Sequence, residues 1–300
     1  MDDLVERIKA AVENADSDPW FPELTTDLAA RAWEYLRREI GLTPHNYGTE
    51  RLLSRNISAH RELITTLRAS SGIAETASTI WIEALTQEWS ARYLSQDVHF
   101  YSADAILNTS IVSCIEDALA TINQVPSLMR TVVSLVQSLH VIEPEDEDHD
   151  VSFSEPHVPF SVFVSVPGRR IPNDTMRVAE AIVHEAMHLQ LTLIARVVPL
   201  IVPMSVKYYS PWKRENRDAE GILQAVFVFA TIDRFLSELF SVTTAVVNKP
   251  YIHHRRNEIR DQICQVRSFR HSKELTEAGF RLVTWLTDLD KHNRSSTISA

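Results

Sequence analysis

The residues best suited to chemistry lie in residues 176–198, which contain the run His184-Glu185-Ala-Met-His188. Two histidines four residues apart on a helix project from the same face, so their imidazole rings can bind one cation. Glu185 follows His184 at about 100° around the helix, within reach of a water or substrate on that cation. The spacing predicts a metal site with His184 and His188 as ligands and Glu185 as a catalytic residue.

The segment that carries these residues predicts a buried helix. Asn173, Asp174 and Thr175 suit its N-terminal cap, and Pro199 ends it. Apolar residues occupy most of its circumference, which is typical of a helix with little access to water. Ionisable groups are costly to bury without partners. A bound metal would compensate the two histidines, and two hydrogen-bonded core histidines beside a partnered glutamate are the alternative.

The composition of the 300-residue chain favours helices. It is 44% hydrophobic and 23% charged, with only 6 glycines, and its apolar residues recur at helical spacing. We expect a mainly α fold: a helical N-terminal half, a short β element around residues 152–166, and a helical C-terminal half built on the His-Glu-x-x-His helix. The helices expected in the first half span residues 4–12, 24–40, 51–69, 73–94, 103–122 and 127–139.

Two regions are expected, residues 1–142 and 151–293, which can also pack as one unit. The acidic run at residues 143–150 between them is interpreted as a solvated connector. Residues 152–166 alternate in polarity and are rich in β-branched and aromatic side chains, which predicts a strand. Helices are expected again at residues 220–247, 255–270 and 275–289, after a polar and aromatic turn at residues 207–214.

The net charge and the first residues of the chain argue against some classes of protein. A net charge of −10 argues against general binding of nucleic acid, which needs a basic surface. The start of the chain lacks a signal-peptide pattern, and its longest apolar run is too short to span a bilayer, so a cytoplasmic protein is expected. Cys114 and Cys264 show no ligand spacing and are expected to be buried free thiols.

Several linked motifs make the second half of the chain, about residues 135–283, resemble a bacterial family of HExxH-type proteins that modify ribosomally made peptides. The motifs are the runs at residues 150–167, 177–188, 208–213, 221–230 and 275–279. Studied members of that family are Fe(II)- and 2-oxoglutarate-dependent peptide β-hydroxylases. The resemblance implies the same oxidoreductase activity here, with a precursor peptide as substrate, and it leaves the oligomeric state open.

The resemblance also implies ligands and a cofactor site. His184 and His188 match the family's two metal histidines, but its third histidine is replaced here by Gln224. An amide oxygen is a weaker ligand than imidazole, and Glu220, one turn earlier, is a possible substitute. The family's Ser-Pro-Trp-Arg motif appears as Ser-Pro-Trp-Lys, so the residues expected to bind 2-oxoglutarate are Tyr209, Ser210, Lys213 and Arg214.

Two other functions stay open. In a zinc peptidase, His184 and His188 would hold Zn²⁺, Glu185 would activate water, and Glu220 or Glu238 would be the third ligand. A non-catalytic homologue that binds the peptide is the other alternative, because Gln224 stands at the expected ligand position. In the hydroxylase interpretation, the peptide is expected to add as a strand beside residues 160–166 or to contact the basic helix at residues 253–270.

Overall fold

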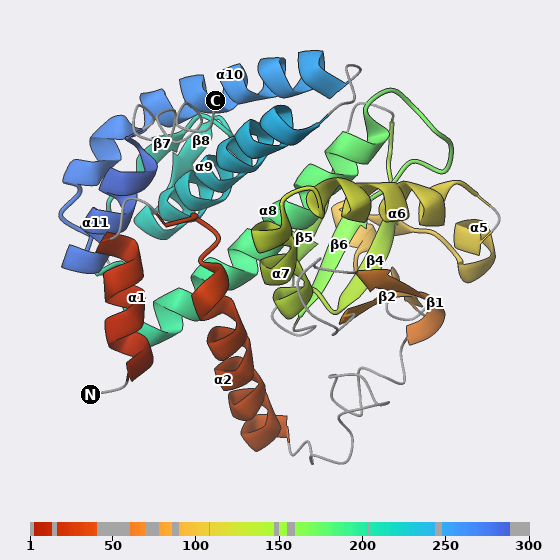
Figure 1. Cartoon of the computed structure of the whole chain (residues 1–300), viewed down its shortest axis with the longest axis horizontal. Helices are drawn as coiled ribbons and strands as arrows, with labels where there is room; N and C mark the ends of the chain where they lie inside the picture. Colours follow the sequence, from red (N-terminus) through yellow and green to blue (C-terminus); the bar gives the residue numbers. More distant parts are fainter. Residues whose placement is uncertain are drawn as a thin grey trace. The chain divides into compact units, whose positions relative to one another are not determined.

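A computed structural model of the chain describes residues 3–13, 17–40, 61–69, 78–85, 90–107, 109–146, 150–154, 160–202, 204–243 and 248–288. In these residues the fold is mainly α with a small mixed sheet (Figure 1), which confirms the predicted fold class. The chain forms two compact units: a sheet unit, Ala29–Leu189, and a helical unit, Met1–Leu28 with Gln190–Ala300. Helices α2 (Pro22–Ile40) and α8 (Asp174–Val197) each continue from one unit into the other.

The sheet unit contains the boundary that the sequence suggested at residues 142–151. Strand β4 (Ser138–Glu143), before that boundary, pairs in parallel with β6 (Ser161–Ser165), after it. The acidic run therefore connects strands of one sheet. In the described residues the strand order is β1-β2-β4-β6-β5, and β3 (His99–Phe100) also pairs with β4. The remaining strands are β1 (Arg61–Ala69), β2 (Ser78–Leu85) and β5 (Ser152–Ser154).

The helices predicted at residues 51–69 and 73–94 are wrong. Residues 61–69 form strand β1, and residues 78–85 form strand β2. In β2, Ile80, Ile82 and Ala84 are buried on one face, but Glu83 on the other face is buried as well. A strand covered on both faces shows no clean alternation, and a short apolar run of that kind cannot be told from a buried helix by periodicity. The helical spacing of Trp81, Ile82 and Leu85 was therefore misleading.

The other predicted helices and strands differ less from the observed ones. The predicted helix at residues 103–122 is two helices, α5 (Ala103–Leu107) and α6 (Ile111–Ile122), and α7 (Pro126–Leu135) ends before β4 begins. The β element predicted at residues 152–166 is present, but as two antiparallel strands, β5 and β6, and not as one strand. Residues 155–159 lie outside the described part. A short 3₁₀ helix, η2 (Leu94–Gln96), begins at the last residue of the helix predicted at residues 73–94.

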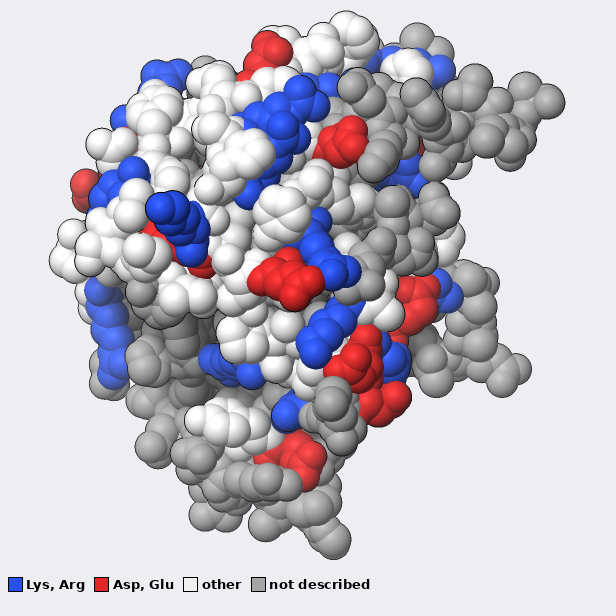
Figure 2. Space-filling view, turned by 90° about the vertical axis from the view of Figure 1, so that its left-hand side faces the viewer, with Lys and Arg blue, Asp and Glu red and all other residues white. Residues whose placement is uncertain are grey.

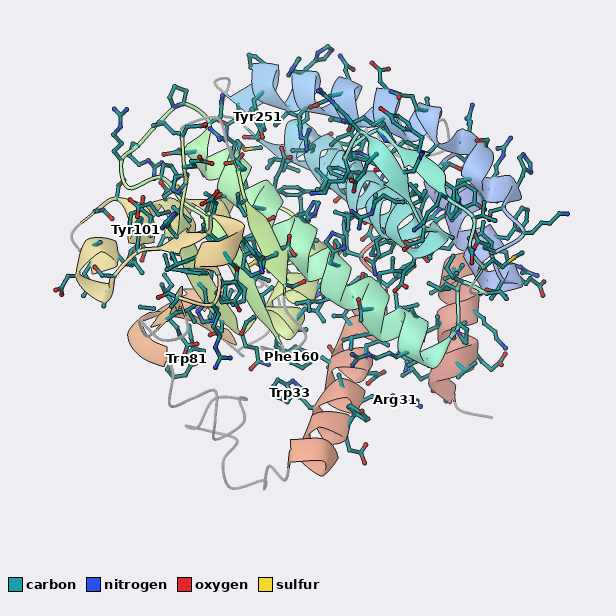
Figure 3. All side chains as sticks on the ribbon, turned by 180° about the vertical axis from the view of Figure 1, so that it is seen from behind. Arg31, Trp33, Trp81, Tyr101, Phe160 and Tyr251 are labelled. Atoms are coloured by element: carbon teal, nitrogen blue, oxygen red, sulfur yellow. The ribbon has the colours of Figure 1, made fainter. Side chains whose placement is uncertain are left out.

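The two faces of the sheet differ in chemistry. One face carries a row that crosses four strands, Glu83, His140, Phe163 and Phe153, in which the His140 and Phe153 rings stack on Phe163 with centroids 4.5 and 4.6 Å away. The opposite face is aliphatic, with Ile82, Leu139 and Val162 in one row. At the edge of this unit, Trp33 on α2 stacks on Phe160 with centroids 4.2 Å apart (Figure 3).

The helical unit packs α1 (Asp3–Glu13), α9 (Ala219–Val242) and α11 (Glu277–Leu286) around aromatic side chains. Phe21 stacks on Phe227 and contacts Trp285, with centroids 6.2 and 5.7 Å away. Helix α10 (Lys249–Gln265) is joined to α9 by buried Asp233, which accepts hydrogen bonds from Arg256 and Arg260. The basic helix expected at residues 255–270 is thus α10 followed by η4 (Arg267–His271).

Charged side chains of both signs share the surface. On the face drawn in Figure 2, Lys and Arg side chains are interspersed with Asp and Glu among the described residues. No helix in the described part of the chain combines the length and apolar character that a bilayer crossing needs.

The two cysteines differ in exposure, and this difference tests the packing of α6. Cys114 is buried, whereas Cys264 is exposed, so the expectation of two buried thiols is wrong for Cys264. Burial, with the nearby negative charge of Asp174, raises the pKa of the Cys114 thiol to about 12.

Since the thiolate is the reactive form, iodoacetamide at pH 8 should alkylate Cys264 in the native protein and reach Cys114 only in denaturant. Mass spectrometry of tryptic peptides measures both, and rapid native alkylation of Cys114 would contradict the packing.

Candidate metal centre

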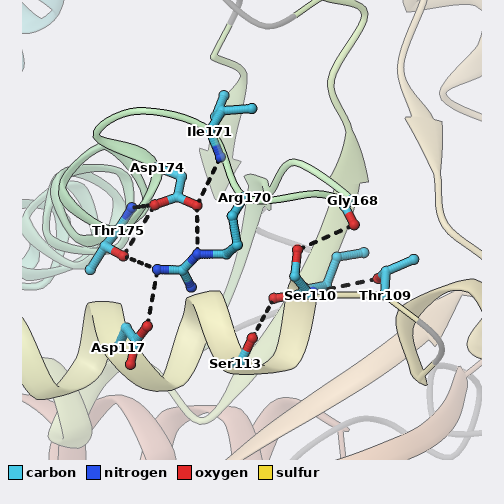
Figure 4. Close-up of polar contacts among 10 residues, drawn as sticks. Thr109, Ser110, Ser113, Asp117, Gly168, Arg170, Ile171, Asp174 and Thr175 are labelled. Carbon is cyan, nitrogen blue, oxygen red and sulfur yellow. Dashed lines mark hydrogen bonds and ion pairs between the residues drawn. The ribbon is translucent and has the colours of Figure 1, made fainter.

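Helix α8, which carries the histidines, is fixed at its start by a network of charged residues (Figure 4). The Asp174 carboxylate, at the first residue of α8, accepts hydrogen bonds from the Thr175 amide and from the Ile171 amide just before the helix. The Arg170 guanidinium lies 2.9 Å from Asp174 and 3.0 Å from Asp117 on α6. Arg170 therefore ties the start of α8 to α6.

The middle of α8 is buried as the sequence predicts. Val183, Ala186 and Met187 have no exposed surface, and Glu185 is 2% exposed. The His184 side chain, by contrast, is 25% exposed, so solvent or a small molecule can reach it. The two histidines are thus partly exposed, whereas Val183, Ala186 and Met187 beside them are buried.

The two imidazole rings converge. His184 Nε2 lies 3.0 Å from His188 Nε2, and the ring centroids are 4.7 Å apart with planes at 68°. Convergence of the Nε2 atoms is what binding of one ion by two histidines requires, and the i, i+4 spacing places the rings on one side of α8 as predicted. A hydrogen bond between the rings also fits this distance, with one neutral ring as donor and the other as acceptor.

Glu185 is held by the sheet. Its Oε1 accepts a hydrogen bond of 2.8 Å from the hydroxyl of Ser152 on β5, and the same oxygen lies 3.9 Å from His184 Nε2. Ser152 and Val164 are cross-strand partners, so this contact comes from the aliphatic face of the sheet. Ser152 therefore orients the carboxylate that stands next to the histidine pair.

A second contact joins α8, nearer its start, to Asp150, two residues before β5. Arg177 donates two hydrogen bonds to the Asp150 carboxylate, of 2.7 and 2.8 Å, in the bidentate geometry that fixes orientation. Both residues line a pocket of about 230 Å³ at the carboxyl ends of β4 and β6, together with Glu145, Asp146 and Arg169. The histidine pair is not part of that pocket.

The expected third ligands belong to the helical unit. There the amide nitrogen of Gln224 lies 3.5 Å from Thr192 Oγ1 on the last part of α8, and Glu220 is exposed in the first turn of α9. Glu238, the other carboxylate considered for zinc, forms an ion pair of 2.8 Å with Arg234. Burial raises the pKa of Glu238, and the Arg234 charge opposes that rise.

The residues expected to bind 2-oxoglutarate form a β-hairpin in the helical unit, made by β7 (Tyr208–Ser210) and β8 (Glu215–Arg217). Ser210 is buried and accepts a hydrogen bond from the Lys213 amide, so it shapes the turn. Tyr209, Lys213 and Arg214 are exposed, and Arg214 has a φ of 53°, an uncommon value for a residue with a side chain.

In the part of the chain that the structure describes, no cluster of three or more His, Cys, Asp or Glu side chains with metal-binding geometry is found. The described centre is therefore a pair of histidines with Glu185 beside it. No protein-family model matches the sequence, and a search of curated proteins finds no match.

Ser152 was not among the residues singled out from the sequence. It lies 33 residues before Glu185, and a serine in a short strand has no feature that marks it as a partner of a distant carboxylate. The signal available was the placement of a strand directly before the metal-site helix, which brings both elements into one unit.

The hydrogen bond between Ser152 and Glu185 gives a stability test. In Ser152→Ala the buried carboxylate loses a donor, which should lower the free energy of unfolding by about 1–3 kcal/mol. Ser154→Ala is the matched control, since Ser154 is partly exposed on the same strand as Ser152. This substitution should change the free energy of unfolding by less than about 0.5 kcal/mol. Urea denaturation measures both, and equal stability of the two variants would show that the contact contributes nothing.

Proposed function

We propose that the protein is a non-haem iron enzyme that uses 2-oxoglutarate and dioxygen to hydroxylate a side-chain β-carbon of a ribosomally made peptide. The observation that carries the proposal is the 3.0 Å separation of His184 Nε2 and His188 Nε2 on a buried helix. The motifs shared with the HExxH-type peptide hydroxylases supply the reaction and the substrate class, and the geometry supports the metal.

The separation suits a shared ligand. His184 Nε2 and His188 Nε2, 3.0 Å apart, would both be within reach of one ion. Fe(II) held by these two histidines would keep positions open for a co-substrate and dioxygen, whereas a peptidase zinc would be held by three protein ligands.

The residues of the chain have separate tasks in this proposal. His184 and His188 bind the metal through Nε2, and the buried side chains of Val183 and Met187 keep water from the inner side of the helix. Fe(II) with 2-oxoglutarate supplies the activation of dioxygen. Glu185, fixed by Ser152, holds a water or a polar substrate group beside His184. Gln224, with Glu220 as its substitute, stays the sequence-based candidate for a further ligand.

The hydrogen bond between the imidazoles supports a second candidate function. A pair that is satisfied by its own N–H···N contact at 3.0 Å needs no metal, and the protein would then bind a peptide without changing it. Metal retention decides between the two, because only the enzyme depends on an ion at the histidine pair.

We expect the purified protein to bind one Fe(II) in anaerobic buffer and to develop a weak visible absorption band when 2-oxoglutarate is added. His184→Ala and His188→Ala should each weaken metal binding by more than about 100-fold, since loss of a direct ligand costs more than the 10–100-fold loss seen for outer-shell partners. His253→Ala, a change of an exposed histidine on α10, is the control and should bind as the parent does.

The readouts are metal content by mass spectrometry and the absorption band. Unchanged metal content in His184→Ala would overturn the assignment of the histidine pair. Tight zinc binding together with peptide cleavage would favour the peptidase, and failure of the parent protein to retain Fe(II) or Zn²⁺ at micromolar concentration would favour the binding protein.

A further inference from the structure

The expectation that a peptide adds beside residues 160–166 is wrong for β6, because β6 is an interior strand. It pairs with β4 on one side and with β5 on the other. Among the described strands, β5 is the last of the sheet on that side. Among the described strands, a strand added on this side of the sheet would therefore pair with β5.

The hydrogen-bond register shows which atoms β5 presents at its outer edge. The Val151 carbonyl accepts a hydrogen bond from the Ser165 amide, so Val151 and Ser165 form a hydrogen-bonded pair of the antiparallel ladder. Such pairs alternate with pairs whose main-chain groups point away. Phe153 therefore bonds to β6, whereas the amides and carbonyls of Ser152 and Ser154 are directed to the outer edge. These four groups suit the main chain of an extended polypeptide.

The side-chain contact of Ser152 connects this edge to the candidate metal centre. Its hydroxyl bonds to Glu185, and Glu185 lies 3.9 Å from His184 Nε2. A residue paired directly opposite Ser152 has its β-carbon about 5 Å from that of Ser152 and on the same face of the sheet. The side chain of that residue would point toward α8 and the histidine pair.

We propose that the outer edge of β5 binds an extended peptide and that the residue opposite Ser152 is the one presented to the histidine pair. This inference rests on the proposed function for the reaction, but the docking itself needs no metal. A second copy of this chain is a poor occupant, since β5 has only three residues, and Pro156 and Pro159 follow it in the sequence. Short edges interrupted by proline are a common protection against pairing between copies.

Ser154→Pro tests the docking surface. Proline is tolerated on an edge strand where its missing N–H faces outward, so β5 should keep its pairing with β6 while losing one outward donor. The probe is a pool of fluorescein-labelled decapeptides in which valine and threonine alternate around one randomised central residue. Fluorescence anisotropy should show binding to the parent, and the proline variant should need about three- to tenfold more protein for half-saturation, the value of one hydrogen bond. Ser154→Ala should bind like the parent.

Two further measurements distinguish failure of the docking surface from failure of the metal assignment. Amide hydrogen exchange of the parent should slow at Ser152 and Ser154 when the pool is added, while Phe153, already bonded to β6, should not change. His184→Ala should bind the pool like the parent, so failure of the metal assignment leaves the docking surface intact. Equal binding by Ser154→Pro, no binding by the parent, or a dimer in sedimentation that Ser154→Pro dissociates would each overturn the proposal.

Discussion

The structure of the candidate centre depends on the burial of α8. A helix with little exposed surface cannot leave polar groups without partners, because each unpaired group costs free energy that burial does not return. Three polar residues of α8 have partners at different levels of the helix: Arg177 bonds to Asp150, Glu185 to Ser152, and the Gln190 amide nitrogen to the Trp20 carbonyl and Thr25. These contacts fix the rotation of the helix about its axis, and that rotation decides where the two imidazoles point.

The sheet matters to the centre through β5 and the residues just before it, which supply two of these partners. Asp150 and Ser152 are two residues apart, and their contacts on α8 are eight residues apart. Two strand residues span about 7 Å and eight helical residues about 12 Å, so the side chains of Arg177 and Glu185 must lean toward each other to reach the strand. A shift of β5 by one residue would move both contacts together and turn Ser152 to the other face.

Much of the centre was predictable from sequence because it depends on local geometry. The caps, the apolar circumference and the i, i+4 histidines all concern one helix, and Asp174, His184 and His188 lie where the pattern predicts. The sheet was predicted less well. Strands β1 and β2 lie in a segment whose apolar residues also fit a helix, and the burial of Glu83 beside Ile82 removes the alternation that marks a half-exposed strand. The partner of Glu185 depends on strand order, which no local pattern specifies.

The position of Glu185 limits the chemistry that the centre can perform. An oxygen that accepts a 2.8 Å hydrogen bond from Ser152 has its orientation set by the sheet, and at 3.9 Å from His184 Nε2 it lies beyond hydrogen-bonding distance of that nitrogen. Glu185 Oε1 is therefore not a hydrogen-bond acceptor for His184 Nε2. The ring's Nε2 faces His188 instead, so either an ion or a single shared proton must separate the two nitrogens. With a proton there, one ring is a donor and the pair is closed to ligands. With an ion, both rings must carry their protons on Nδ1, and the same 3.0 Å would separate the two ligand nitrogens of a metal site.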